Sequence, residues 1–307
     1  MKKHIISTLF LYAVCADFFL IATAEIPVIF IHKSNSYYLK DSLWQAKQFN
    51  KRVILLGDET NNKYPDIEYY NMQDYSEGAK YFASIYQNFA PDYVYDYHLL
   101  CFQRWFILRD FAKAHNITKC FYCDSDIMLY CDVTEEQKRF ATSNFALLIH
   151  FEGGGASGHT SYWNSQKSLE DFCSFLIKSY TSPAKMEEWK NLYLQEYIKN
   201  GWAISDMTAL NEFGINEWSK DKKSVVNLES IENNTTYDVN MNEDEQYSIY
   251  TIMKNQALGS SIKDITWINH LPHCYNKQLS KMVQFKSLHF QGPAKSLMNQ
   301  YKMEKSK

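Results

Sequence analysis

The order of apolar and polar positions along the chain predicts alternating strands and helices. Residues 26–31 form a continuous apolar run, which indicates a first strand. Residues 37–49 carry apolar side chains at helical spacing, and residues 53–56 form a second apolar run that ends at Gly57-Asp58. A strand, a helix and a second strand in this order predict a parallel βαβ unit, in which helices cover the faces of a parallel sheet.

The same alternation continues along the chain. We expect further strands at residues 66–72, 120–123, 127–129, 145–149, 265–268 and 283–290, and helices at residues 75–89, 99–114, 169–180 and 186–198. A short helix should begin at Ser205 or Asp206, and the polar stretch 225–250 should be irregular. The predicted fold class is therefore α/β, with a mostly parallel sheet flanked by helices in a single domain over residues 26–307.

The first 25 residues differ from the rest. A basic start is followed by an apolar run from Ile5 to Ala24, which ends in small residues. This pattern predicts a signal peptide or a membrane anchor, and so a membrane-associated or secretory location. Asp17 within the apolar run disfavours both, because a carboxylate is costly inside a bilayer. A spurious upstream start is the third interpretation, and it would leave the protein cytoplasmic.

Composition excludes several classes of function. The chain has 307 residues and a net charge of −3, so it has no electrostatic footprint for nucleic acid. No G-x-G-x-x-G follows the first strand, and the sequence contains no Walker loop, which disfavours dinucleotide binding and P-loop chemistry. Cys120 and Cys123 lie on one predicted strand and should point to opposite faces, so neither a local disulfide nor a zinc knuckle is expected.

Two carboxylates lie at the end of a predicted strand. Asp124-Ser125-Asp126 follows the apolar run Phe121-Tyr122-Cys123, and a second apolar run begins at Ile127. Ligands of open α/β folds bind at the carboxyl edge of the sheet, where this triplet should lie. Paired carboxylates there can hold Mn²⁺ or Mg²⁺ with open positions for phosphate oxygens. A solvated turn is the alternative, but the apolar flanks on both sides disfavour it.

A second candidate segment lies near the C-terminus. His289, Gly292 and Lys295 follow the last predicted strand. The imidazole can complete a metal shell, the glycine permits close approach of the backbone, and the lysine can neutralise phosphate. We expect His289 to lie close to the Asp pair in space, although the two are far apart in the sequence.

Together the two segments resemble a known family. Asp124-Ser125-Asp126 after a strand, with a terminal H-x-x-G-x-x-K, is similar to the GT-A glycosyltransferases, which have a Rossmann-like sheet. The nearest resemblance is to family-8 retaining enzymes such as glycogenin and bacterial lipooligosaccharide galactosyltransferases. It implies that Asp124, Asp126 and His289 bind Mn²⁺ (or Mg²⁺), with Gly292 and Lys295 at the donor diphosphate and Asp124 and Ser125 among the residues that bind the donor nucleotide.

Further segments fall in the order that this family has. Arg104 lies in a segment whose arginine approaches the donor, and Gly158 lies where the family lines the donor sugar. Asp206 begins a segment that resembles Asp-Gln-Asp-x-Leu-Asn, which implies sugar contact or transition-state stabilisation, although aspartate is also a favoured helix N-cap. Met207 and Thr208 depart from that pattern, so the stereochemistry only leans towards retention.

The resemblance implies a metal-dependent glycosyltransferase. It would move a hexose from a nucleotide sugar, in the first place a UDP-sugar, to a glycan, lipid or protein acceptor. A metal-dependent phosphohydrolase or nucleotidyltransferase is an alternative, with Glu152 or Asp206 serving a second ion. A non-catalytic nucleotide-sugar-binding protein of the same fold is another, because a fold does not determine a function.

Overall fold

A computed structural model describes residues 25–89, 95–150, 155–242, 246–251 and 261–303. Residues 1–24, which hold nearly all of the predicted signal peptide or anchor, lie outside the described residues, as does Glu152. Within the described part of the chain, no helix is both long enough and apolar enough to span a bilayer.

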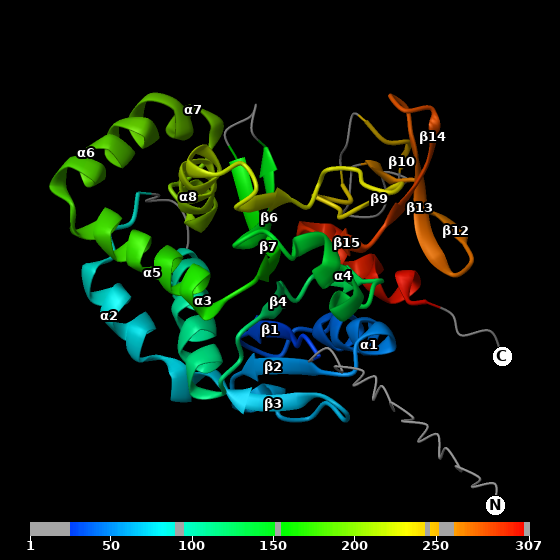
Figure 1. Ribbon diagram of the computed structural model, residues 1–307, viewed down its shortest axis with the longest axis horizontal. Coiled ribbons are helices and arrows are strands. Elements are labelled where there is room, and N and C mark those ends of the chain that lie inside the picture. The colour runs from blue at the N-terminus through cyan, green and yellow to red at the C-terminus, as the bar shows by residue number, and fades with distance from the viewer. Residues whose placement is uncertain (1–24, 90–94, 151–154, 243–245, 252–260, 304–307) are drawn as a thin grey trace, which may run out of the picture.

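A seven-stranded sheet forms the centre of the molecule, in the order β3–β2–β1–β4–β7–β6–β8 (Figure 1). The strands are β1 (Val28–His32), β2 (Val53–Gly57), β3 (Glu68–Asn71), β4 (Cys120–Cys123), β6 (Phe145–His150), β7 (Gly155–Trp163) and β8 (Val225–Asn227). Neighbouring strands of this sheet are parallel except where β7 pairs with β4 and β6. The predicted α/β fold class with a mostly parallel sheet is confirmed.

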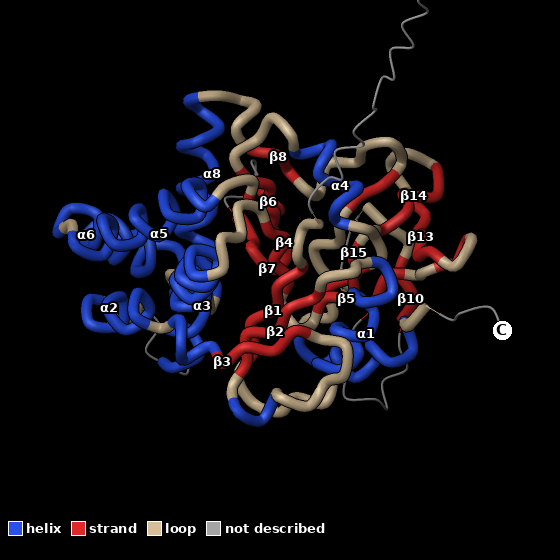
Figure 2. The backbone as a smooth tube through the Cα atoms, turned by 60° about the horizontal axis from the view of Figure 1, so that its bottom comes forward, coloured by secondary structure: helices blue, strands red, loops and turns tan. Residues whose placement is uncertain are grey.

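Helices cover both faces of the sheet, as Figure 2 shows. One face carries α2 (Glu77–Ile85), α3 (Tyr95–Ala114), α5 (Gln166–Thr181), α6 (Pro183–Leu192) and α8 (Asp206–Lys220). The other face carries α1 (Leu39–Phe49) and α4 (Val133–Phe140). Short 3₁₀ turns η1 (Glu59–Asn61) and η2 (Met72–Tyr75) flank β3.

The alternation of side chains along each strand explains why the core has two halves. Ile29 and Ile31 of β1 point into the cluster under α3 and α5, whereas Val28 and Phe30 point into the cluster under α1. Cys120 and Cys123 of β4 divide in the same way, and the described cysteines are all free thiols. The prediction that these two cysteines face opposite sides is therefore confirmed.

The C-terminal third builds smaller sheets beside α1 and α4. Strands β12 (Thr266–Ile268), β13 (Leu271–Asn276), β14 (Lys281–Phe285) and β9 (Thr235–Thr236) form one sheet, and β10 (Ile249–Thr251) pairs with β11 (Ser261–Lys263). β15 (Ser287–His289) pairs antiparallel with β5 (Ile127–Leu129), which directly follows the Asp pair. This pairing carries the C-terminal segment to the edge of the central sheet.

One predicted strand is two strands in the structure. Residues 283–290 divide between β14 and β15, which belong to different sheets. The chain changes sheets at Lys286, whose N–H donates to the Thr236 carbonyl at 2.7 Å and whose carbonyl accepts from the Tyr130 N–H at 2.8 Å. The N–H of Lys286 bonds to one sheet and its carbonyl bonds to the other. A single apolar run therefore contributes a strand to each of the two sheets.

Other predictions from the local pattern were also wrong. The helix expected at residues 186–198 is α6 followed by a π-turn, η3 (Tyr193–Tyr197), and by α7 (Ile198–Asn200), which ends at Gly201 with φ +67°. The helix from Asp206 is not short but runs for 15 residues. The stretch 225–250 contains the short strands β8, β9 and the start of β10, because neighbouring strands supply partners that a local pattern does not reveal.

Candidate functional site

A cleft lies at the carboxyl edge of β1 and β4, where the triplet Asp124-Ser125-Asp126 links β4 to β5. Its volume is about 250 Å³. The side chains that line it come from β1, the segment between β1 and α1, α3, β4, the triplet and the C-terminal 3₁₀ helix η4 (Gly292–Tyr301), and they include His32, Tyr38, Arg104, Asp124, Ser125, Asp126 and Lys295. The structure thus places the triplet at the carboxyl edge of the sheet, as predicted.

Arg104 joins two carboxylates that the sequence separates widely. Its Nη1 lies 2.5 Å from Asp124 Oδ1, and its Nη2 lies 2.6 Å from Asp206 Oδ2. The Tyr122 hydroxyl also donates to Asp124 Oδ1 at 2.5 Å. Burial acts to raise the pKa of the Asp124 carboxyl, but Arg104 and the Tyr122 hydrogen bond outweigh it, and the net pKa is lowered. Asp124 is therefore an anion that Arg104 neutralises.

Asp206 is the first residue of α8, and Ser205 occupies the N-cap position. The Asp206 carboxylate is buried and accepts a second hydrogen bond, from Trp105 Nε1 at 2.9 Å. It lies behind Arg104 and is not among the residues that line the cleft. The N-cap interpretation of Asp206 is therefore wrong, since its carboxylate binds Arg104 and Trp105.

Gly158 lies in strand β7, against the indole that holds Asp206. A Cβ at this position would lie 2.5 Å from the Trp105 ring and 2.8 Å from Leu210 Cδ1. Only a residue without a side chain lets Trp105 pack this closely on the sheet. The described structure thus gives Gly158 a packing role behind the cleft, and its contact with a donor sugar stays a prediction.

The second predicted cluster brings the C-terminal motif to Asp126. His289 Nε2 lies 3.7 Å from Asp126 Oδ1, and Lys295 Nζ lies 3.1 Å from Asp126 Oδ2. The Phe290 N–H also donates to the Asp126 carbonyl at 3.0 Å. The expectation that His289 lies close to the Asp pair is confirmed. Gly292 has φ +56° and begins the turn that returns Lys295 to the cleft.

The protonation of the His289 ring follows from its other partner. Its Nδ1 lies 2.6 Å from the Val239 carbonyl, which can only accept, so Nδ1 carries the proton. In the neutral ring, Nε2 then presents a lone pair to Asp126 Oδ1, an oxygen that has no hydrogen-bond partner among the described residues. Two buried acceptors that face each other need a cation or a proton between them.

These donors fit a divalent ion in part. A carboxylate oxygen and an imidazole nitrogen are suitable ligands for Mn²⁺. Asp124, the third predicted ligand, turns one oxygen towards Arg104 and Tyr122. Within the described ranges, no three His, Cys, Asp or Glu side chains gather closely enough to hold a metal. The structure thus assembles two of the three predicted ligands, and the ion itself stays a prediction.

Two side chains in the cleft were missed by the sequence reasoning. His32 ends β1, its Nδ1 lies 2.8 Å from the Ser125 hydroxyl, and its Nε2 has no hydrogen-bond partner in the part of the chain that the structure describes. Burial lowers the pKa of the His32 ring. Tyr38 lies under Lys295, whose ammonium is 5.0 Å from the ring centre. A polar residue that ends a buried strand at the ligand edge was the available signal for His32.

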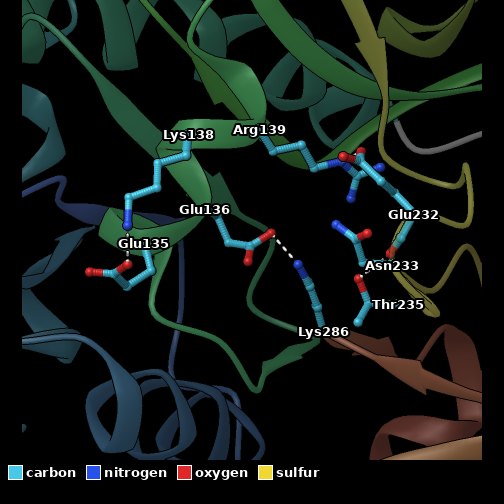
Figure 3. Close-up of a pocket in the computed structure, with 8 residues that line it drawn as sticks. All are labelled: Glu135, Glu136, Lys138, Arg139, Glu232, Asn233, Thr235 and Lys286. Carbon is cyan, nitrogen blue, oxygen red and sulfur yellow. Dashed lines mark hydrogen bonds and ion pairs between the residues drawn. The ribbon is translucent and has the colours of Figure 1, made fainter.

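A second cavity, of about 330 Å³, lies between α4 and the β9–β14 edge (Figure 3). Each basic side chain that lines it lies beside a carboxylate: Lys138 by Glu135, Arg139 by Glu232 and Lys286 by Glu136. Because these charges neutralise one another, this cavity offers no net charge to a ligand. The candidate site is therefore the cleft at the Asp124-Ser125-Asp126 triplet.

The chain matches no protein-family model and no curated protein. Among solved structures it is similar to mouse xyloside xylosyltransferase 1, with a TM-score of 0.48 and 8% identity over 69% of this chain and 87% of that one. It is also similar to the galactosyltransferase LgtC in complex with donor and acceptor sugar analogues, with a TM-score of 0.33 and 14% identity over 61% of this chain and 70% of that one.

A third similar structure is the glycosyltransferase GlyE of Streptococcus pneumoniae, with a TM-score of 0.33 and 15% identity over 66% of this chain and 45% of that one. All three of these similar structures are of glycosyltransferases. At these TM-scores and identities the likeness is too distant to carry an argument about function, which therefore rests on the geometry of the cleft.

Proposed function

We propose that the protein is a metal-dependent glycosyltransferase of the GT-A type, nearest to family 8. It moves a hexose from a nucleoside-diphosphate sugar, in the first place a UDP-sugar, to a glycan, lipid or protein acceptor. The observation that carries the proposal is the pair of facing acceptors, Asp126 Oδ1 and His289 Nε2, beside the ammonium of Lys295. A divalent ion between them and a diphosphate beside it would satisfy all three groups.

Mn²⁺ or Mg²⁺ would be held by Asp126 and His289, with Asp124 as the third ligand if a ligand draws it from Arg104. When bound, the ion supplies charge neutralisation to the departing diphosphate. Lys295 provides a second positive charge next to the same oxygens. Asp126 raises the pKa of Lys295 against the lowering effect of burial, so that its ammonium stays charged.

Arg104 supplies a third positive charge at the cleft. Both of its carboxylate partners fix its guanidinium, and its Nη1 lies close to the triplet that would carry the ion. A planar guanidinium held in place can donate two N–H hydrogen bonds to two oxygens of one phosphate group. We propose that Arg104 binds the donor and that Asp206 holds Arg104 in place. An oxocarbenium-like sugar and retention of configuration belong to the same proposal, with Asp206 acting through Arg104 because its carboxylate does not line the cleft.

The alternatives make different products. A phosphohydrolase with a second ion would need further carboxylates, and Asp206 is already bonded to Arg104 and Trp105. Incubation with a panel of UDP- and GDP-sugars, with and without Mn²⁺, separates the three functions. The proposal expects slow, Mn²⁺-dependent release of a nucleoside diphosphate. Release of a monophosphate would instead identify a hydrolase, and no release from any tested donor would favour a binding protein.

A further inference from the structure

We infer that Asp238 and Lys263 are positioning residues for His289: they fix its ring so that the Nε2 lone pair faces Asp126. The inference rests on the proposed function, because it deepens the role of the candidate metal ligand. Neither residue lines the cleft, so both would act through His289 and not on the donor itself.

The segment that holds the His289 ring is residues 238–241. The Val239 carbonyl accepts from His289 Nδ1 at 2.6 Å, and Asp238 Oδ2 accepts from the His289 backbone N–H at 2.9 Å. The Met241 N–H in turn donates to the His289 carbonyl at 2.9 Å. His289 is therefore bonded to this segment at its ring, its N–H and its carbonyl, so the position of the segment sets the direction of Nε2.

Lys263 holds the segment from the other side. Its ammonium lies 2.8 Å from Asp238 Oδ1 and also donates to the Asn240 carbonyl. Its backbone N–H donates to the Met241 carbonyl at 2.9 Å. Lys263 belongs to β11, so the short β10–β11 sheet supports His289, the candidate metal ligand, through the side chain and the backbone N–H of Lys263.

The chemistry of the pair points to positioning rather than to stability. Both side chains are fully buried, at 0% exposure. A buried ion pair is commonly no more stabilising than apolar residues of the same volume, because desolvation offsets the attraction. The Asp238 carboxylate provides two acceptor oxygens at a fixed separation, one for the Lys263 ammonium and one for the His289 N–H. Partners of this kind orient metal-ligating histidines and tune their affinity for the ion.

A matched pair of double variants tests the inference. Asp238→Ala with Lys263→Met removes both charges together with the acceptor for the His289 N–H. Asp238→Asn with Lys263→Met removes the same charges, but the amide oxygen can still accept that N–H. Calorimetry of Mn²⁺ binding to the full chain with UDP present compares the two variants with the wild type.

The first variant should bind Mn²⁺ about 10- to 100-fold more weakly than the wild type, the range found for changes around metal ligands. The second keeps the acceptor for the His289 N–H but lacks the Lys263 ammonium, so its affinity should lie between those of the first variant and the wild type. Thermal unfolding establishes that both variants fold. Equal Mn²⁺ affinity in all three proteins would overturn the inference while leaving the proposed function intact.

A measurement on the wild type alone covers the cases in which a variant fails to fold or no protein binds Mn²⁺. Long-range ¹H–¹⁵N NMR of the His289 ring, without metal, reports its tautomer. The inference expects the proton on Nδ1. A proton on Nε2 would overturn it. If Mn²⁺ does not bind to the wild type in the presence of UDP, the proposed function fails, and the tautomer still decides whether the network orients the ring.

Discussion

Arg104→Met should cost more stability than the loss of any exposed ion pair in this protein. The Arg104 side chain is 12% exposed, and it bridges Asp124, at 26%, and Asp206, at 3%. Methionine keeps the length of the stem and removes the charge, so two largely buried carboxylates lose their cation. Removing one partner of a buried pair destabilises by about 3–5 kcal/mol, because an uncompensated charge is left behind.

The pH dependence of that cost gives a sharper test. In the wild type the folded pKa of Asp124 lies below its unfolded value of about 3.9, so this carboxyl stabilises the fold above that value. The contribution disappears as the pH falls through the folded pKa. Without Arg104 the pKa of Asp124 should rise, and protonation should relieve the variant at low pH. The difference in unfolding free energy should therefore be larger at pH 7 than at pH 4.5.

Urea denaturation followed by tryptophan fluorescence measures the effect at both values of pH. Arg52→Met is the matched control, because Arg52 pairs with Glu68 at 3.1 Å on the surface. An exposed pair of this kind contributes about 0–1 kcal/mol. Arg104→Met combined with Asp206→Asn should recover part of the loss, because one of the two stranded charges is gone. If Arg104→Met loses no more unfolding free energy than the control, or loses the same amount at both values of pH, Arg104 does not neutralise Asp124 and Asp206 as described.

Three further predictions concern the cleft. Asp126→Asn should abolish Mn²⁺-dependent binding of UDP in calorimetry while leaving the thermal unfolding temperature nearly unchanged; wild-type affinity would remove Asp126 from the metal site. Lys295→Met should weaken binding of UDP by roughly 10- to 150-fold, the loss of one charged hydrogen bond of about 1.5–3 kcal/mol, and leave binding of uridine unaffected. Lys302→Met is its control, because Lys302 pairs with Asp41 at 2.5 Å on α1; equal losses for UDP and uridine would mean that Lys295 supports the fold. Burial lowers the folded pKa of His32 against the raising effect of Asp58. Below about pH 6.5 the unfolded state therefore binds more protons than the folded state, and the wild type loses stability as the pH falls. His32→Asn should make this loss of stability less steep, measured as thermal unfolding between pH 5 and 8. An unchanged slope would place the titration elsewhere, for instance at His98, whose pKa burial also lowers.

Local patterns in the sequence were enough for the fold class and for the place of the Asp pair. The apolar runs of β1, β2 and β4 and the helical spacing of α1 and α3 each depend on residues that are near neighbours in the chain. A strand that ends in two carboxylates must present them at the edge of a parallel sheet, whatever the remaining topology is. The motif near the C-terminus could also be paired with them, because its residue types suit a diphosphate.

Only the tertiary structure decided how the charges are shared. Nothing in the sequence around Asp206 indicates that its carboxylate binds Arg104 and Trp105 instead of capping α8, because that choice depends on the packing of α3 against β7. The tautomer of His289 likewise depends on the Val239 carbonyl, a backbone group that no sequence pattern places. Long-range contacts assign each buried polar atom its partner, and so they determined which oxygen of the Asp pair stays open to a ligand.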